Sequence, residues 1–295
     1  MPISVSQWVG CIFLLVGCIR PALAHDLWIQ PSTFVVPEGA SVQVALRVGH
    51  EDDVRQLALP TDRVVRFEVF SPGVPGPRPL ASLSGQHNGQ TSEQAAAGST
   101  RLSRPGVHTL VYQSRPKYIE LDSKSFAGYL EHEGLDAVLA ERVSRDEVSK
   151  VGKERYGRYC KALVRVGSGS NGFDRKVGLP MEIVAVTDPF VQDPKGTLRF
   201  KLLFRSAPLP DARVDLLRLD DLRQGTARRS DESGEVVFPA PDDGAWMVAV
   251  THMIRAETVE SLETARSAEP ADWESFWATL SFDRIALGQG SKSEG

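Results

Sequence analysis

The sequence contains very little cysteine. Only three cysteines occur in 295 residues, and two of them, Cys11 and Cys18, lie in the apolar N-terminal segment. This number excludes a disulfide-rich scaffold. If the N-terminal segment is removed after Ala24, Cys160 is the only cysteine left and no internal disulfide can form. Its aromatic surroundings predict a buried structural cysteine.

The sequence also lacks an excess of charge of one sign. Lysine and arginine total 34 and aspartate and glutamate total 38, which gives a formal net charge of -4 without a polybasic block. This balance argues against nucleic acid and anionic membrane surfaces as partners. With 41% hydrophobic and 24% charged residues, the composition is that of an ordinary globular protein.

The motifs of several enzyme classes are absent from the sequence. It has no Walker A motif, no G-x-S-x-G elbow, no H-E-x-x-H helix and no C-x-x-C pair. Gly167, Gly169 and Gly172 fit G-x-G-x-x-G, but Pro180 follows too soon for a helix to open after the last glycine. We interpret this stretch as a flexible connection rather than a dinucleotide-binding loop.

Only one apolar run, residues 8–19, has a length of interest for a membrane. Its 12 or so residues are fewer than the roughly 20 that cross a bilayer, and they fit the h-region of a secretory signal. An A-x-A cleavage site at 22–24 predicts a signal peptide over 1–24 and a mature periplasmic protein that begins at His25 without a membrane span. The alternative is a lipobox that ends at Cys18, which would be lipidated.

Short segments with strand periodicity dominate the remaining sequence. Residues 41–48 and 64–70 alternate polar and apolar side chains, and similar segments return after Pro180, separated by Pro, Gly and Asp turns. We predict a mainly β protein with two immunoglobulin-like β-sandwich domains. The N-terminal domain spans residues 25–170, the C-terminal domain spans 171–287, and residues 288–295 form a disordered tail.

A helical insertion is predicted at about 118–160, within the N-terminal domain. Phe126, Tyr129 and Leu130 follow helical spacing, and Gly134 separates this segment from a second short helical pattern. The basic and aromatic stretch 153–161, KERYGRYCK, is expected to begin as a turn of helix and to continue into a strand at 162–166.

The predicted N-terminal residue is itself a candidate metal ligand. A free N-terminal histidine offers its α-amine and its Nδ1 atom, which together chelate a metal ion. A second imidazole would complete the three-nitrogen arrangement called a histidine brace, which suits Cu(II) or Ni(II). His25 can act in this way after cleavage at residue 24, whereas lipidation at Cys18 would prevent it.

Two further histidines lie at strand ends, where loops gather and sites are often built. His50 precedes the acidic loop at 51–53, and His252 follows the strand at 245–250. His108, inside an apolar strand, is expected to be packed, and His87 to be solvated. His132 is interpreted as a helix-surface residue, with an accessory metal site as the alternative.

Several stretches of the chain, in this order, resemble the NikM-like family. They are HDLWI at 25–29, VGH at 48–50, YIELDSKSFAGYLEHEGL at 118–135, KERYGRYCKAL at 153–163, APLPDARV at 207–214, DESGEVVF at 231–238, WMVAVTHM at 246–253 and WATLSF at 277–282. These are exported bacterial proteins with a domain of unknown function, associated with periplasmic nickel or cobalt uptake.

The resemblance implies an all-β periplasmic protein with a helical insertion and no catalytic activity. It implies a divalent transition metal as the ligand, with His25, His50 and His252 as the metal-binding residues. Asp26 would be a further ligand or the partner of a ring N–H. The chain has no His-rich segment and no C-terminal membrane anchor, so a transport role would need a separate membrane transporter component.

The sequence therefore favours a periplasmic protein that binds one divalent transition metal ion, as the extracytoplasmic component of a nickel/cobalt uptake system. The metal stays open among nickel, cobalt and copper, because copper wins thermodynamically at almost any nitrogen site. Two alternatives remain. One is a metal-free immunoglobulin-like interaction or adhesion module, and the other is a copper histidine-brace redox protein.

Overall fold

The computed structural model describes residues 25–51, 53–82, 96–191, 196–256 and 270–284. In this part of the chain the protein is mainly β, with several open sheets packed in a sandwich-like arrangement. The predicted fold class is therefore confirmed. The predicted signal peptide, the lipobox, His87 and the tail at 288–295 lie outside the described residues.

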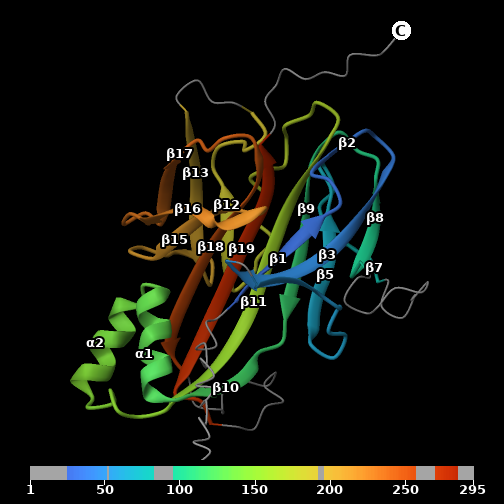
Figure 1. Ribbon diagram of the computed structural model, residues 1–295. Helices are drawn as coiled ribbons and strands as arrows, with labels where there is room; N and C mark the ends of the chain where they lie inside the picture. The colour runs from blue at the N-terminus through green and yellow to red at the C-terminus, as the bar shows by residue number, and fades with distance from the viewer. Residues whose placement is uncertain (1–24, 52, 83–95, 192–195, 257–269, 285–295) are drawn as a thin grey trace, which may run out of the picture.

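The largest sheet among the described residues has ten strands and runs through the centre of the molecule (Figure 1). In spatial order its strands are β16 (Asp221–Arg229), β15 (Arg213–Arg218), β18 (Gly244–Arg255), β19 (Trp273–Arg284), β11 (Gly152–Val166), β9 (Gly106–Ser114), β5 (Val64–Phe70) and β6 (Arg78–Pro79). Beside this path, β2 (Val35–Val36) and β10 (Lys117–Leu121) pair with β11.

The central sheet joins the two halves of the chain through a parallel pair of strands. Strand β11 lies beside β19, with Glu154 opposite Trp273 and Arg158 opposite Trp277. The sheet thus continues across residue 170, where the sequence places a domain boundary. The division into two domains remains a prediction.

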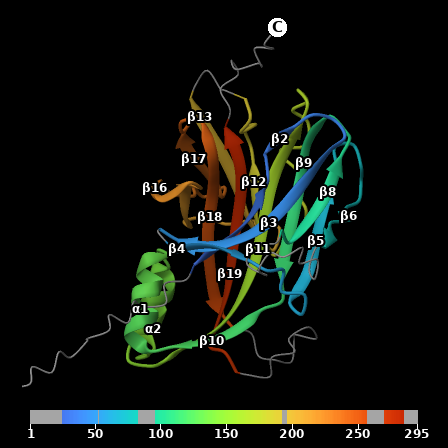
Figure 2. The ribbon, with the colours of Figure 1, turned by 45° about the vertical axis from the view of Figure 1, so that its right-hand side comes forward.

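Two smaller sheets cover the central one at its two ends (Figure 2). In the described residues the first contains β1 (Asp26–Pro31), β3 (Ala40–His50), β8 (Gly98–Leu102), β7 (Ala81–Ser82) and β4 (Asp53–Leu57). The second contains β12 (Met181–Ala185), β13 (Thr197–Phe204), β14 (Ala207–Pro208) and β17 (Glu235–Pro239).

The alternation of polar and apolar side chains at 41–48 explains how the first smaller sheet packs against the central sheet. Val42, Val44 and Leu46 of β3 are fully buried and pack in one hydrophobic core with β5, β9 and β11, whereas Ser41 and Gln43 point outward. A second core lies between β12, β13 and β17 on one side and β15, β18 and β19 on the other.

Strand β11 is buried on both faces, as expected for a central strand with a parallel neighbour. Tyr159 and Leu163 enter the second core, and Cys160 and Val164 enter the first. The Cys160 thiol donates to the carbonyl oxygen of Leu27 at 3.0 Å, and burial raises the pKa of the thiol to about 12. The prediction of a buried structural cysteine is confirmed.

Two helices, α1 (Ser123–His132) and α2 (Asp136–Ser144), form the helical insertion. The Asp122 carboxylate begins α1 by accepting from the backbone N–H groups of Lys124 and Ser125, at 3.1 and 2.9 Å. Phe126, Tyr129 and Leu130 are buried against β18 and β19. The strands contribute Met253, Trp273 and Trp277 to this cluster, which confirms the helical spacing.

The turn of helix expected at residue 153 is wrong. Strand β11 begins at Gly152 and continues to Val166, because the alternating residues of KERYGRYCK place Glu154, Tyr156 and Arg158 on one face of a strand. None of the helices in the described part of the chain has the length and apolar character needed to cross a membrane.

Candidate functional site

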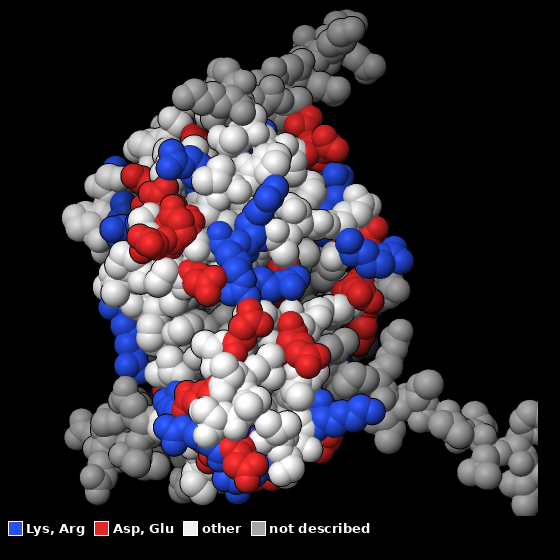
Figure 3. All heavy atoms as spheres, turned by 90° about the vertical axis from the view of Figure 1, so that its left-hand side faces the viewer, with Lys and Arg blue, Asp and Glu red and all other residues white. Residues whose placement is uncertain are grey.

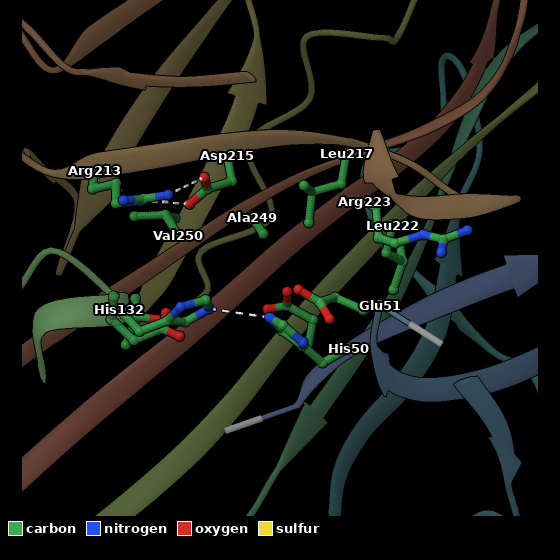
Figure 4. Close-up of a pocket in the computed structure, with 13 residues that line it drawn as sticks. His50, Glu51, His132, Arg213, Asp215, Leu217, Leu222, Arg223, Ala249 and Val250 are labelled. Atoms are coloured by element: carbon green, nitrogen blue, oxygen red, sulfur yellow. Dashed lines mark hydrogen bonds and ion pairs between the residues drawn. The ribbon is translucent and has the colours of Figure 1, made fainter. Parts of the chain in front are cut away.

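Two histidines from distant parts of the chain face each other above a cavity (Figure 4). His50 is the last residue of β3 and His132 is the last residue of α1, 82 positions further on. Their Nε2 atoms lie 3.2 Å apart, and their ring planes are inclined at 62°. In the neutral pair one Nε2–H donates and the other Nε2 accepts.

Local backbone geometry places each histidine at the end of its element. The β3 strand turns back into β4 directly after His50, where Glu51 has a φ of +48° and His50 pairs with Asp53. Helix α1 ends after His132 because Gly134 has a φ of +66°, which favours glycine. The Leu135 N–H then donates to the Leu130 carbonyl at 2.9 Å and closes the helix end.

The cavity beneath the two rings has a volume of about 190 Å³. Carboxyl groups from four segments border it: those of Asp26, Glu51, Glu133 and Asp215. The Glu133 carboxylate accepts from the Thr251 hydroxyl at 2.7 Å. A small apolar cluster lies against it, formed by Trp28, Leu222, Met247 and Ala249.

One basic side chain of the cavity is already neutralised. The Arg213 guanidinium donates to both Asp215 oxygens, at 2.9 and 3.1 Å. This ion pair borders the cavity on the side away from His50 (Figure 4). Within the described part of the chain, Asp26 and Glu133 have no such bidentate cationic partner.

Burial displaces the pKa values of both of these carboxyl groups. Desolvation raises the pKa of Asp26 to about 6, against the opposing positive charge of Arg158. Desolvation also raises the pKa of Glu133 to about 8, with the negative charge of Asp26 as the next cause. Desolvation, followed by the neighbouring His50 and Arg213, lowers the pKa of His132. Such displaced groups in one cavity are typical of functional sites.

The predicted metal ligands do not all lie at this cavity. His50 and Asp26 border it. His25 borders a neighbouring cavity instead, with its Nε2 atom 3.5 Å from an Asp53 carboxylate oxygen. The structure therefore brings together His50 and Asp26, with His25 next to Asp26 in the chain.

His252 lies apart from the other predicted ligands. Successive residues of a strand point to opposite faces, so Thr251 reaches the cavity while His252 faces the core between the sheets. Its ring contacts that of Phe204 at 4.5 Å between centroids. Burial, followed by the charge of Arg205, lowers the pKa of His252 to about 4. His108 is packed as expected, with its Nε2 atom 2.8 Å from the Arg104 carbonyl oxygen.

The donor atoms present fit a metal ion only in part. In the described residues no three His, Cys, Asp or Glu side chains are close enough together to enclose an ion. The histidine pair alone has suitable spacing, because two nitrogens bound to one ion at about 2.0–2.1 Å lie roughly 3 Å apart. A third ligand would require a carboxylate of the cavity to turn toward the pair.

His132 was expected on the surface of a helix, with an accessory metal site as the alternative, and no local sequence pattern indicates a role for Glu133. Their position follows from the fold, because α1 packs across β18 and β19 and directs its C-terminal end at the end of β3. The sequence feature that could have indicated this position is Gly134, which marks the end of the helix directly after these two residues.

The side of the molecule that carries the helices mixes charges of both signs (Figure 3). Ion pairs near the helices join Arg213 to Asp215 and Arg229 to Asp136 and Asp211. Basic and acidic side chains are therefore interspersed rather than gathered into a field of one sign.

Fold and site together define a sandwich-like β protein with a histidine and carboxylate cavity where a helical insertion meets two sheets. The chain belongs to the DUF4198 family, a domain of unknown function whose profile matches residues 22–254. This membership agrees with the resemblance seen in the sequence. No curated protein shows significant similarity to the chain.

Proposed function

We propose that the protein binds a divalent transition metal ion at the His50–His132 pair. The observation that carries the proposal is the 3.2 Å separation of two Nε2 atoms from elements 82 positions apart. Burial favours the neutral form of His132, whose lone pair is then available to a metal. Imidazole nitrogens suit nickel, cobalt and copper.

Further ligands would come from the acidic side of the same cavity and from the predicted N-terminus. Asp26 and Glu133 offer carboxyl oxygens in the lining of the same cavity. His25 borders the neighbouring cavity but precedes Asp26, so a mature protein that begins at His25 would carry an α-amine and an Nδ1 atom next to Asp26 in the chain. His252 is left out of the proposed set, because it lies on the opposite face of β18.

The biological role we propose is that of a periplasmic metal-binding protein that serves as the extracytoplasmic component of a nickel/cobalt uptake system. The signal-like run at 8–19 and the cleavage site at 22–24 support export. The resemblance to the NikM-like family supports nickel or cobalt as the metal. A membrane transporter component would then receive the ion from this protein.

The test is a calorimetric titration of the mature, metal-free protein with Ni(II), Co(II) and Cu(II). We expect about one equivalent of one of these ions to bind, and each of His50→Ala and His132→Ala to weaken binding by at least about tenfold. His25→Ala should weaken it too if the N-terminus takes part. His252→Ala is the matched control and should bind within about twofold of the parent.

The proposal fails if none of the three ions binds, which would favour the metal-free interaction module. It also fails if His50→Ala and His132→Ala bind the ion as tightly as the control variant. Circular dichroism of each variant before titration separates lost binding from lost folding.

A further inference from the structure

A second cavity, of about 320 Å³, shares no described lining residue with the histidine cavity. Three neighbouring strands of the central sheet supply most of its lining: β10, β11 and β19. His25, Val48 and Arg55 border it from the β1, β3 and β4 side. Its volume lies at the lower end of the range for small-molecule sites.

Strand periodicity builds the floor of this cavity. Glu154, Tyr156 and Arg158 are alternate residues of β11 and share one face of the strand. In the parallel neighbour, Trp277 lies opposite Arg158. In the antiparallel neighbour, Ile119 lies opposite Glu154. One acid, one base and three apolar or aromatic side chains therefore gather on one surface.

The Arg158 guanidinium forms no ion pair in the described part of the chain, although its positive charge acts at longer range on Asp26, Glu133 and Glu154. Its carbon lies 4.4 Å from the centre of the Trp277 ring and 5.2 Å from that of Tyr156. The described residues include no carboxylate within ion-pair distance of it, and its buried Nη1 atom has no hydrogen-bond partner. Leaving a buried N–H donor of a charged guanidinium without an acceptor costs free energy of folding. The paired N–H groups of a guanidinium match the two oxygens of a carboxylate.

Glu154 supplies a second unsatisfied atom on the same cavity. The side chain is 1% exposed. Its Oε1 atom accepts from the hydroxyl groups of Tyr129 and Ser275. Its Oε2 atom is buried and has no partner among the described residues. A buried carboxylate oxygen without a partner is rare in native proteins, and a donor group on a ligand would satisfy it.

We propose that this cavity binds a small organic acid. The ligand's carboxylate pairs with the Arg158 guanidinium, its apolar or aromatic body packs against Tyr156 and Ile119, and a hydroxyl group on the ligand donates to Glu154 Oε2. A cationic ligand is disfavoured, because Arg158 already lies over the rings of both Trp277 and Tyr156 that a cation would use.

The test measures the binding of four probes to the metal-free full mature chain by ligand-observed NMR. The probes are 4-hydroxybenzoate, benzoate without the hydroxyl group, acetate without the ring, and 4-hydroxybenzyl alcohol without the charge. We expect saturable binding of 4-hydroxybenzoate, weaker binding of benzoate, and binding of acetate and the alcohol at least about tenfold weaker.

Variants locate the probe in the cavity. Arg158→Lys keeps the charge but removes the fork, and should weaken 4-hydroxybenzoate binding by at least about tenfold. Arg228→Lys is the matched control, because Arg228 is exposed on β16 and does not border the cavity; it should bind within about twofold of the parent. His50→Ala should bind the acid unchanged, which separates this proposal from the proposed metal site.

Three results would overturn the proposal. The first is no saturable binding of either aromatic acid by the folded parent protein. The second is equal binding of 4-hydroxybenzoate and the uncharged alcohol, a comparison that does not depend on any variant folding. The third is an equal loss of binding in Arg158→Lys and Arg228→Lys.

Discussion

At the scale of single residues, the candidate site depends on side chains whose chain positions are far apart. The position of His50 at a strand end and of Asp26 near the predicted N-terminus can be read from the sequence. The partner of His50 cannot, because no local pattern shows that the end of α1 reaches the end of β3. The sheet face to which His252 points could have been predicted from the sequence, since side chains alternate along a strand and His252 must point away from the face of Thr251.

The buried side chain of His252 makes the stability of the folded protein depend on pH. Burial and Arg205 lower the pKa of this histidine from 6.5 to about 4, so the unfolded chain takes up a proton before the folded chain does. The folded state therefore loses stability as the pH falls from 6.5 to 4 and keeps this contribution above 6.5. A shift of this size corresponds to at most about 3 kcal/mol.

The measurement is the difference in unfolding free energy between the parent and His252→Gln, by urea denaturation from pH 7.5 to 4.5. We expect the parent to lose stability relative to the variant across this range. Taking the difference cancels the carboxyl groups, whose raised pKa values act in the opposite direction. A difference that stays constant with pH would show that the imidazole is not held neutral.

At the scale of elements, the sequence predicted which segments form strands better than it predicted which strands pair with one another. The alternation in β3 and the helical spacing in α1 are local patterns, and the structure confirms both. The interpretation of 153–161 failed because its basic and aromatic residues also fit a helix. Only the pairing of β11 with β10 and β19 makes the strand the stable choice.

The C-terminal end of α1 depends on the backbone conformation of Gly134. Gly134 has a φ of +66°, and a Cβ atom there would lie 2.8 and 2.9 Å from the Arg213 side chain. Gly134→Ala should therefore destabilise the protein, by about 1–2 kcal/mol for the backbone strain alone. It should also weaken metal binding, because this glycine positions His132.

The matched control for this prediction lies in the same helix. Gly128 is exposed within α1, and a Cβ atom there would meet nothing within 4 Å. Gly128→Ala should stabilise the protein by about 0.5–1 kcal/mol. Chemical denaturation of each variant and of the parent would give both changes in unfolding free energy. Equal effects of the two substitutions would contradict the described helix end.

At the scale of the whole molecule, the two halves of the chain share one sheet and a fully buried ion pair. The Lys161 ammonium group donates to a Glu182 carboxylate oxygen at 2.9 Å and to the carbonyl oxygens of Ile183 and Arg175. The Glu182 carboxylate in turn accepts from backbone N–H groups at 177–179. Such an arrangement across residue 170 could not be predicted from sequence, because it joins segments through space.

We therefore expect Lys161→Met to destabilise the protein by about 3–5 kcal/mol, because it leaves the Glu182 carboxylate buried without its cation. Unfolding should remain a single transition, since the strands of both halves are hydrogen-bonded in one sheet. Lys150→Met, at an exposed lysine, is the control and should change stability by less than about 0.5 kcal/mol. Two separate thermal transitions, resolved by calorimetry, would contradict this expectation.

The proposed site requires that His50 and His132 bind one transition metal ion together. Anomalous diffraction from crystals of the metal-loaded mature protein tests it most directly. We expect one anomalous peak about 2.0–2.1 Å from the Nε2 atoms of both histidines, with a further ligand from Asp26, Glu133 or His25. A peak that lies at other residues, with the two imidazoles still 3.2 Å apart and no ion between them, would contradict the claim.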